Sequence, residues 1–268
     1  MRLDKAAVER RFDRHAATYE RHARVQAEMA ERMITRLEEL DRVPGAILEL
    51  GCGTGVLTEL LVKSFPDSEI TAIDIAPGMV DVCATRFSGF ERVEVVLGDA
   101  EARCWGERRF DFVVSNATVQ WFDRPQSTMA SIVDSLEPGG ATIHATFGPR
   151  TFEELFATLS QIDREHGDPP QRRGLEMLSA DERCSILGAA GAVAVTARSR
   201  LRVVEYESCR TFLSALREMG VSTGRGAGRS AARLAEVVRR YDREYRSWSG
   251  VRATFEVVEL EGWRPADP

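Results

Sequence analysis

The chain has 268 residues, of which 43% are hydrophobic and 29% are charged, as in an ordinary globular protein that buries a sizeable core. Its formal net charge of -6 argues against nucleic-acid binding and membrane-surface binding, because both need a basic surface. No signal peptide or membrane-spanning apolar run is recognisable and the five cysteines form no C-x-x-C pair, so we expect a cytoplasmic protein without a disulfide framework or a metal site.

The first predicted element is a helix over residues 4–40, where apolar positions recur at helical spacing. Phe12 and Tyr19 lie seven residues apart on one face of it, and Gln26 lies seven residues further on. The residues "RVPG" then break the pattern. Because this helix precedes the first strand, we expect residues 1–42 to form a helical lid on the main domain.

A regular alternation of strands and helices follows. We expect strands at 46–50, 68–74, 92–99, 110–116 and 140–147, and helices at 56–65, 76–87 and 125–136, the last closed by "EPGG". Short apolar strands that alternate with helices indicate a parallel sheet covered on both faces. We place this core at residues 43–148.

The pattern changes after the fifth strand. We expect a helix at 151–162, a polar loop at 164–174, a strand at 193–206, helices at 209–220 and 230–248 joined by the flexible link "GRGAGR", and a last strand at 251–260. The two late strands are expected to complete the first sheet. Residues 43–268 then form one domain, with a helical insertion at about 150–192 and a sheet-completing part at 193–268.

The turn "ELGCGTG" lies between the first strand and the first helix of the core, at the sheet edge where α/β proteins bind ligands. Gly51, Gly53 and Gly55 carry no side chains, so the backbone can approach a bound molecule, and the following helix presents free N–H groups there. A tight turn that binds nothing has the same pattern. The glycines alone therefore do not establish a ligand site.

Two acidic residues extend the argument. Asp74 ends the second strand and is placed to accept hydrogen bonds from two ribose hydroxyls. Asp99 ends the third strand and is suited to an exocyclic adenine amine. Either residue alone is also typical of a helix cap or a turn. Together they outline a nucleoside that lies along the sheet edge.

The glycine spacing favours S-adenosylmethionine over a dinucleotide. The dinucleotide fingerprint is G-x-G-x-x-G/A, whereas here the third glycine, Gly55, comes one place early and Val56 follows it. Glu49, beside the turn, suits a ligand with an ammonium and a sulfonium better than a pyrophosphate. An NAD oxidoreductase is disfavoured also because no acid or base for hydride transfer is recognisable.

Taken together, "ILELGCGTG", "AIDIAPGMV", "LGDAE", "FDFVVSNATVQW" and "LEPGG" resemble the motifs of class I S-adenosylmethionine-dependent methyltransferases. The resemblance implies a doubly wound, mostly parallel α/β sheet of seven strands with the last one antiparallel. It also implies the residues that hold the cofactor: Asp74 at the ribose, Ile75 and Met79 around the adenine, Asp99 and Ala100 at the adenine edge, and Gly51, Gly53 and Asn116 around the methionine portion.

The methyl acceptor is harder to derive. An amine or a phenol must lose a proton before it is methylated, whereas a carboxylate already carries its lone pair. No general base stands out: His144 lies within a strand, where a buried structural histidine is expected, and His15 and His22 lie on the N-terminal helix. This favours an ionised acceptor, whose desolvation requires Arg, Tyr or Trp groups around it.

A second resemblance covers almost the whole chain. The stretch from Phe12 to Gln26, "SNATVQWFDRP", "FGPRTFEEL", "TFLSALREMG" and "VRATFEVV" are similar to the malonyl-acyl-carrier-protein O-methyltransferases of biotin synthesis, while "GVSTGRGAGRSAARL" and the tail "ELEGWRPADP" depart from their pattern. It implies methylation of the free malonyl carboxylate on a carrier protein, giving the ester that primes pimeloyl synthesis. We expect the N-terminal helix to cover the cofactor, with Gln26 near the cofactor and Tyr19 facing the methyl donor or the acceptor. Trp121 is expected to form a wall of the acceptor pocket.

A carrier protein is acidic and would dock on a basic surface. Eight arginines lie between Arg198 and Arg233 against Glu205, Glu207 and Glu218, although an ordinary solvated surface has the same composition. Two other functions stay open. One is a methyltransferase of a free small carboxylic acid, similar to the trans-aconitate enzymes. The other is a non-catalytic protein that keeps the S-adenosylmethionine pocket as a binding module.

Overall fold

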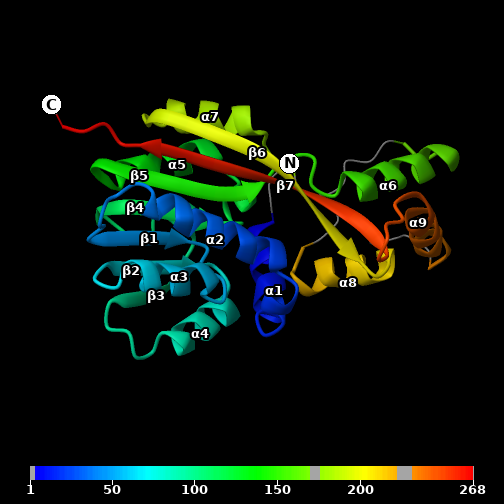
Figure 1. Ribbon diagram of the computed structural model, residues 1–268, viewed down its shortest axis with the longest axis horizontal. Helices are drawn as coiled ribbons and strands as arrows, with labels where there is room; N and C mark the ends of the chain where they lie inside the picture. Colours follow the sequence, from blue (N-terminus) through cyan, green and yellow to red (C-terminus); the bar gives the residue numbers. More distant parts are fainter. Residues whose placement is uncertain (1–3, 170–175, 222–230, 268) are drawn as a thin grey trace.

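The computed structural model describes residues 4–169, 176–221 and 231–267, and the strands among them form a seven-stranded sheet in the order β3-β2-β1-β4-β5-β7-β6 (Figure 1). All neighbouring strands are parallel except β7, which runs antiparallel to both β5 and β6. The strands are β1 (Ala46–Leu50), β2 (Glu69–Asp74), β3 (Val93–Leu97), β4 (Phe110–Asn116), β5 (Leu136–Phe147), β6 (Val193–Tyr206) and β7 (Val251–Trp263). The predicted doubly wound, mostly parallel sheet is confirmed.

Helices cover both faces of the sheet. On one face lie α2 (Arg24–Glu38), α3 (Val56–Ser64) and α4 (Pro77–Arg86), and on the other lie α5 (Pro125–Asp134) and α7 (Ala180–Ala189). The helices start where the sequence allows it, because Gly55 caps α3 with a φ of 91° and prolines occupy the first positions of α4 and α5. Because β1 to β4 are parallel, their carboxyl ends meet at one edge of the sheet, where α3 and α4 begin.

The N-terminal segment is not the single helix that was expected over residues 4–40. It is broken into α1 (Lys5–His15), the short 3-10 turn η1 (Tyr19–Arg21) and α2. At the break the Thr18 hydroxyl bonds to the carbonyl of His15, which competes with the helical pattern. Helix α2 packs into the core with Met29 and Leu37 fully buried, whereas α1 lies against α4.

Strand β5 is longer than expected at its start. The glycines of "EPGG" were predicted to end the preceding helix, but they lie inside the strand, which begins at Leu136. The register between β4 and β5 shifts between Phe110 and Phe112, and Gly139 adopts a φ of 73°. The glycine pair therefore forms an irregularity within the ladder, where a side chain at Gly140 would approach the carbonyl of Asp111 at 2.9 Å.

Helix α7 was not predicted, because its few apolar residues do not line up on one face. A local signal was nevertheless present: Ser179 and Glu182 form a capping box at its start. The expected link "GRGAGR" and most of the expected loop at 164–174 lie outside the described residues or at the end of α6 (Glu153–Glu165).

The remaining helices form a group at one end of the sheet. Helices α6 and α8 (Cys209–Glu218) both contact α9 (Ala231–Glu244). Figure 1 shows all three beside the carboxyl end of β6 and the start of β7. Their packing centres on the rings of Phe152, Phe212 and Phe255. Within the described ranges, no helix is both long and apolar enough to cross a membrane.

One buried carboxylate joins this helical group to the sheet. Glu154, at the start of α6, is 5% exposed and accepts hydrogen bonds from the backbone N–H and the hydroxyl of Thr254 in β7, at 3.0 and 2.5 Å. Its neighbour Glu153 points outward and pairs with Arg150 at 2.9 Å. The two adjacent glutamates thus differ in burial while they share one helical turn.

We expect Glu154→Ala to lower the free energy of unfolding by about 2–4 kcal/mol, because it leaves a buried N–H and a buried hydroxyl without their acceptor. The matched variant Glu153→Ala should change it by less than about 0.5 kcal/mol, since an exposed ion pair contributes little. Urea denaturation followed by circular dichroism measures both. Equal losses in the two variants would contradict this account.

Candidate active site

The carboxyl edge of the sheet opens into a cavity of about 740 Å³, its open mouth included. Ten of the predicted site residues line it: Tyr19, Gly51, Gly53, Asp74, Ile75, Met79, Asp99, Ala100, Asn116 and Trp121. A smaller adjoining cavity shares Tyr19, Gly51, Gly53 and Asn116 with it and adds Gln26 and Glu49. Gly55 lines neither cavity. The fold thus brings together residues that lie far apart in the sequence.

The three glycines of the turn differ in what surrounds the position that a Cβ atom would occupy. Gly51 has a φ of 76°, and a Cβ there would lie 1.9 Å from the Thr118 hydroxyl. Gly55 caps α3, where a Cβ would lie 2.8 Å from the ring of Phe87, so its role is in the fold. Gly53 has a φ of 55° and no atom within 4 Å of the Cβ position. Only Gly53 therefore leaves open space on the cavity side.

Asp74 holds the turn and faces the cavity at once. One carboxylate oxygen accepts the N–H of Gly53 and the other accepts the N–H of Ala76, both at 2.9 Å. Burial raises the pKa of this carboxyl, and the backbone hydrogen bonds partly offset that effect. Each oxygen keeps a lone pair, so the group can still accept hydrogen bonds from a ligand.

The smaller cavity gathers hydrogen-bond acceptors. The side-chain oxygens of Gln26 and Asn116 are buried and have no hydrogen-bond partner within the described residues. Glu49 is 1% exposed, accepts the Thr58 hydroxyl at 2.6 Å, and has its pKa raised to about 8 by burial. Buried acceptors without donors are costly unless a ligand supplies the donors. This end of the site therefore fits an ammonium group, as S-adenosylmethionine carries.

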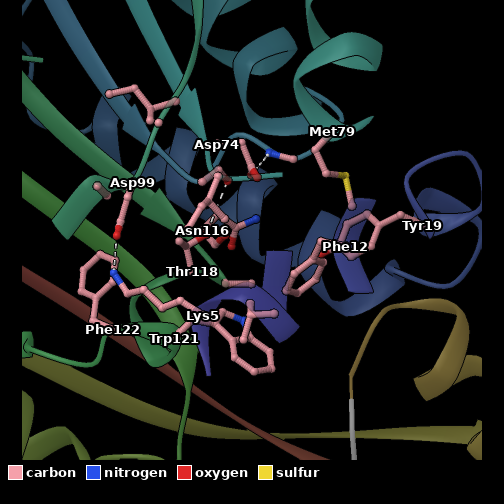
Figure 2. Close-up of a pocket in the computed structure, with 18 residues that line it drawn as sticks. Lys5, Phe12, Tyr19, Asp74, Met79, Asp99, Asn116, Thr118, Trp121 and Phe122 are labelled. Atoms are coloured by element: carbon pink, nitrogen blue, oxygen red, sulfur yellow. Dashed lines mark hydrogen bonds and ion pairs between the residues drawn. The ribbon is translucent and has the colours of Figure 1, made fainter. Parts of the chain in front are cut away.

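Helix α1 and the turn η1 cover the mouth (Figure 2). The ring of Phe12 packs edge-on against the rings of Trp121 and Tyr19, with centroid-to-centroid distances of 5.6 and 6.2 Å. Asp13 accepts the N–H of Gly78, at the start of α4, at 2.7 Å. The covering segment is thus pinned on both sides of the cavity.

Tyr19 stays a neutral phenol. Burial in the site and the neighbouring charge of Asp74 raise its pKa far above the ordinary value. It can therefore donate a hydrogen bond to an anion, but it is not a base at physiological pH. No histidine is among the described residues that line the two cavities. His144 is fully buried elsewhere, and its pKa is lowered to about 3 by burial and by Arg183.

Sequence reasoning missed several residues of the cavity wall: Lys5, Val8, Thr118 and Phe122. Thr118 and Phe122 lie within the recognised motif "SNATVQWFDRP", so their place in this loop was the available signal. Lys5 and Val8 belong to the first turns of the N-terminal helix, where nothing in the pattern pointed inward. Among the residues that the structure describes, no group of three or more His, Cys, Asp or Glu side chains could hold a metal ion.

Known proteins are similar to this chain in sequence and in fold. Residues 47–140 match the family model described as a methyltransferase domain. The chain is 34% identical to the malonyl-[acyl-carrier protein] O-methyltransferase of Paenibacillus sp. (strain JDR-2), over 96% of this chain and 98% of that protein. It is 32% identical to the protein of the same name from Halalkalibacterium halodurans, again over 96% and 98%.

Solved structures give the same fold at low sequence identity. The YcgJ protein from Bacillus subtilis matches with a TM-score of 0.64 and 15% identity, over 90% of this chain and 99% of that chain. The N-methyltransferase NodS from Bradyrhizobium japonicum WM9, in complex with S-adenosyl-L-homocysteine, matches with a TM-score of 0.52 and 15% identity, over 96% and 98%.

The fold, the cavity at its carboxyl edge and these matches define a class I S-adenosylmethionine-dependent methyltransferase, and its cofactor is S-adenosylmethionine. The resemblance seen in the motifs is thereby confirmed. Because the likeness runs over nearly the full length of both chains, the protein belongs to the family of the malonyl-[acyl-carrier protein] O-methyltransferases.

We expect Gly53→Ala to weaken binding of S-adenosyl-L-homocysteine at least about tenfold, because the new methyl group projects into the cavity. Gly106→Ala is the matched control: Gly106 has a φ of 68° and equally open space, but it lies in a surface loop. Both variants should lose about 1 kcal/mol of stability from the left-handed conformation. Calorimetric titration and thermal unfolding measure the two effects, and equal affinities for the ligand would refute the assignment of Gly53.

Binding should also depend on pH through Glu49. With a pKa of about 8 in the ligand-free protein, its carboxyl is protonated at pH 7, and a bound ammonium favours the ionised form. We therefore expect proton release on binding and an affinity that rises from pH 6 to pH 8. Titrations in two buffers of different ionisation enthalpy measure the released protons.

The Glu49→Gln variant is the control, because it cannot ionise. It should bind the ligand more weakly and lose most of the pH dependence, apart from any share of Asp74, whose pKa is raised in the same direction. In the ligand-free wild type the raised pKa also makes stability fall as the pH rises from about 4 to about 8, since the unfolded chain loses the proton first. An unchanged pH profile in Glu49→Gln would contradict the role of this carboxyl.

Proposed function

We propose that this protein transfers the methyl group of S-adenosylmethionine to the free carboxylate of a malonyl group on an acyl carrier protein. The main support for this proposal is the full-length similarity to proteins named malonyl-[acyl-carrier protein] O-methyltransferase, at 34% and 32% identity. The product would be the methyl ester that primes synthesis of the pimeloyl precursor of biotin. This is the function that the sequence motifs also imply.

The chemistry of the cavity supports a carboxylate acceptor. The bound cofactor supplies an electrophilic methyl group on a positively charged sulfur, and a carboxylate needs no base to attack it. The described wall of the cavity contains the neutral phenol of Tyr19 and three further aromatic rings, those of Phe12, Trp121 and Phe122, and it contains no histidine. Such a wall excludes water and leaves alignment as the main contribution, which is worth effective molarities of ~10⁵ M or more.

Each side chain at the mouth of the cavity then has a role in methyl transfer. In this proposal the Tyr19 hydroxyl donates a hydrogen bond to the acceptor carboxylate and orients it. Trp121 and Phe12, packed edge-on at 5.6 Å, wall the acceptor and exclude water. Tyr19 and Trp121 therefore position the acceptor. Asp74, Asp99 and Glu49 hold the cofactor from the other side of the cavity.

The predicted docking surface between Arg198 and Arg233 is less basic than its composition implies. Arg202 pairs with Glu28 at 2.6 Å and Arg200 with Glu259 at 3.4 Å. Arg217 and Arg233 also have acidic neighbours, while Arg225 and Arg229 lie outside the described residues. Within the described part of this region, Arg198 and Arg210 are the arginines that remain for an acidic carrier protein.

The test is a transfer assay with methyl-labelled cofactor, in which malonyl-carrier protein, free malonate and trans-aconitate are offered in parallel. We expect label in the malonyl-carrier protein as an alkali-labile ester, with kcat/KM at least about a hundredfold above that for free malonate, because the carrier contributes binding energy to the transition state. Equal transfer to the free acids would establish a small-acid methyltransferase instead. Cofactor binding without transfer to any acceptor would establish a non-catalytic module.

A further inference from the structure

Lys5 places its ammonium between two carboxylates at the mouth of the cofactor cavity. Its Nζ lies 2.6 Å from Asp99, and it also forms an ion pair with Glu101. Figure 2 shows the side chain extended along the mouth from α1 to Asp99, in front of Phe122. The lysine side chain is 26% exposed and that of Glu101 is fully buried, so this pair is far better shielded from water than an ordinary surface ion pair.

Glu101 joins this contact to a third segment. Its carboxylate accepts the N–H groups of Asp123 and Arg124, at 3.0 and 2.6 Å, and the hydroxyl of Thr128 at 3.1 Å. These residues follow Trp121 directly and begin α5. One buried carboxylate therefore connects the covering helix, the end of β3 and the loop that walls the acceptor side.

Asp99 keeps room for the cofactor while it holds the lysine. One of its oxygens accepts the N–H of Glu101 at 2.9 Å, and the other accepts the Lys5 ammonium. A carboxylate offers about four lone-pair positions, so both oxygens can accept one more hydrogen bond. The group therefore suits an amine donor such as that of adenine.

We propose that Lys5 is a positioning residue that clasps the lid: its ammonium holds α1 closed across the adenine end of the cofactor site and couples that closure to the loop of Trp121. The ion pair is partly buried, spans the mouth and ends on the residues that face the cofactor. The inference rests on the cofactor site and not on the identity of the methyl acceptor. Its failure would therefore leave the proposed acceptor untouched.

The chain itself provides an internal reference for the test. It contains one other lysine, Lys63, which lies on α3, pairs with Glu59 and has a side chain that is 64% exposed. Limited labelling of the intact wild-type protein with an amine-reactive reagent, read by peptide mass spectrometry, compares the two lysines in one sample. The α-amine of Met1 is scored separately.

We expect Lys5 to react more slowly than Lys63 in the free protein. Saturating S-adenosyl-L-homocysteine should slow Lys5 by about a further tenfold and leave Lys63 unchanged, because a closed lid must open before its lysine reacts. An unaltered Lys5 to Lys63 ratio with and without the ligand would overturn the proposal. This measurement needs no variant, so it does not depend on the folding of an altered chain.

Variants then separate positioning from folding. Lys5→Met should weaken binding of S-adenosyl-L-homocysteine about tenfold, as expected when one partner of a partly buried pair is lost. Lys5→Arg should restore most of the affinity, and Lys63→Met should leave it unchanged. Calorimetric titration gives the affinities, and thermal unfolding shows whether each variant is folded. Wild-type affinity in a folded Lys5→Met would contradict the clasp.

Glu101→Gln tests the coupling to the acceptor loop. Its effect should appear in the labelling of Lys5, which should become nearly as fast with ligand as without it. Intrinsic tryptophan fluorescence should show a smaller change on ligand binding than in the wild type, since Trp121 lies in the connected loop. If Glu101→Gln keeps the wild-type protection of Lys5, the clasp does not act through Glu101 and the coupling is wrong.

Discussion

The whole site depends on one buried carboxylate, that of Asp74. It accepts the N–H groups of Gly53 and Ala76 and so fixes the glycine turn against the end of β2. The turn itself is anchored to the same strand, because the N–H groups of Gly51 and Cys52 both reach the carbonyl of Ile73, at 2.7 and 2.9 Å. These bonds hold the backbone in left-handed conformations that only glycine adopts without strain. The free side of Gly53 and the remaining lone pairs of Asp74 then face the cavity together.

The electrostatics of the site follow from the charge of the ligand. The polar groups of the site are mostly hydrogen-bond acceptors: the carboxylates of Glu49, Asp74 and Asp99 and the unpaired side-chain oxygens of Gln26 and Asn116. Lys5 is the single cation among the described residues that line the main cavity. Removing carboxylates from water disfavours their charged form, so burial raises the pKa values of Glu49 and Asp74 even though both accept hydrogen bonds. A bound cationic cofactor stabilises the ionised carboxylates, so relief of their unfavourable burial in the free protein contributes to the free energy of binding.

The sequence predicted those parts of the structure whose causes are local. Strands β1 and β4 begin and end as expected, and Gly55, Pro77 and Pro125 mark the helix starts, because apolar alternation, glycine and proline act over a few residues. The cavity could be anticipated in outline, since the carboxyl ends of parallel strands share one edge. The parts that failed have causes outside their own segment.

The break between α1 and α2 is the clearest case. The periodicity of residues 4–40 continues through it, and the local bond from Thr18 to His15 became apparent only in the structure, where the two halves pack on different partners, α4 and the sheet. The glycines of "EPGG" likewise look like a helix end, and only the register of β4 against β5 shows an irregular strand. Lys5 could not be assigned to the site because its partners, Asp99 and Glu101, lie more than ninety residues away.

The same break explains how a covered cofactor site can open. Helix α2 is held by apolar contacts, with Met29, Ala30 and Leu37 fully buried in the main core. Helix α1 has a single residue buried within it, Val8. Its polar contacts are Lys5 to Asp99 and Glu101 and Asp13 to Gly78. The partly buried ring of Phe12 packs on Trp121 and on the small apolar cluster of Ala16, Ala76 and Met79. Polar contacts exchange readily with water, whereas buried apolar surface does not, so detaching α1 should cost less free energy than detaching α2. The 3-10 turn at Tyr19 lies between the two. Tyr19, which we propose orients the acceptor, therefore lies at the junction of the two helices.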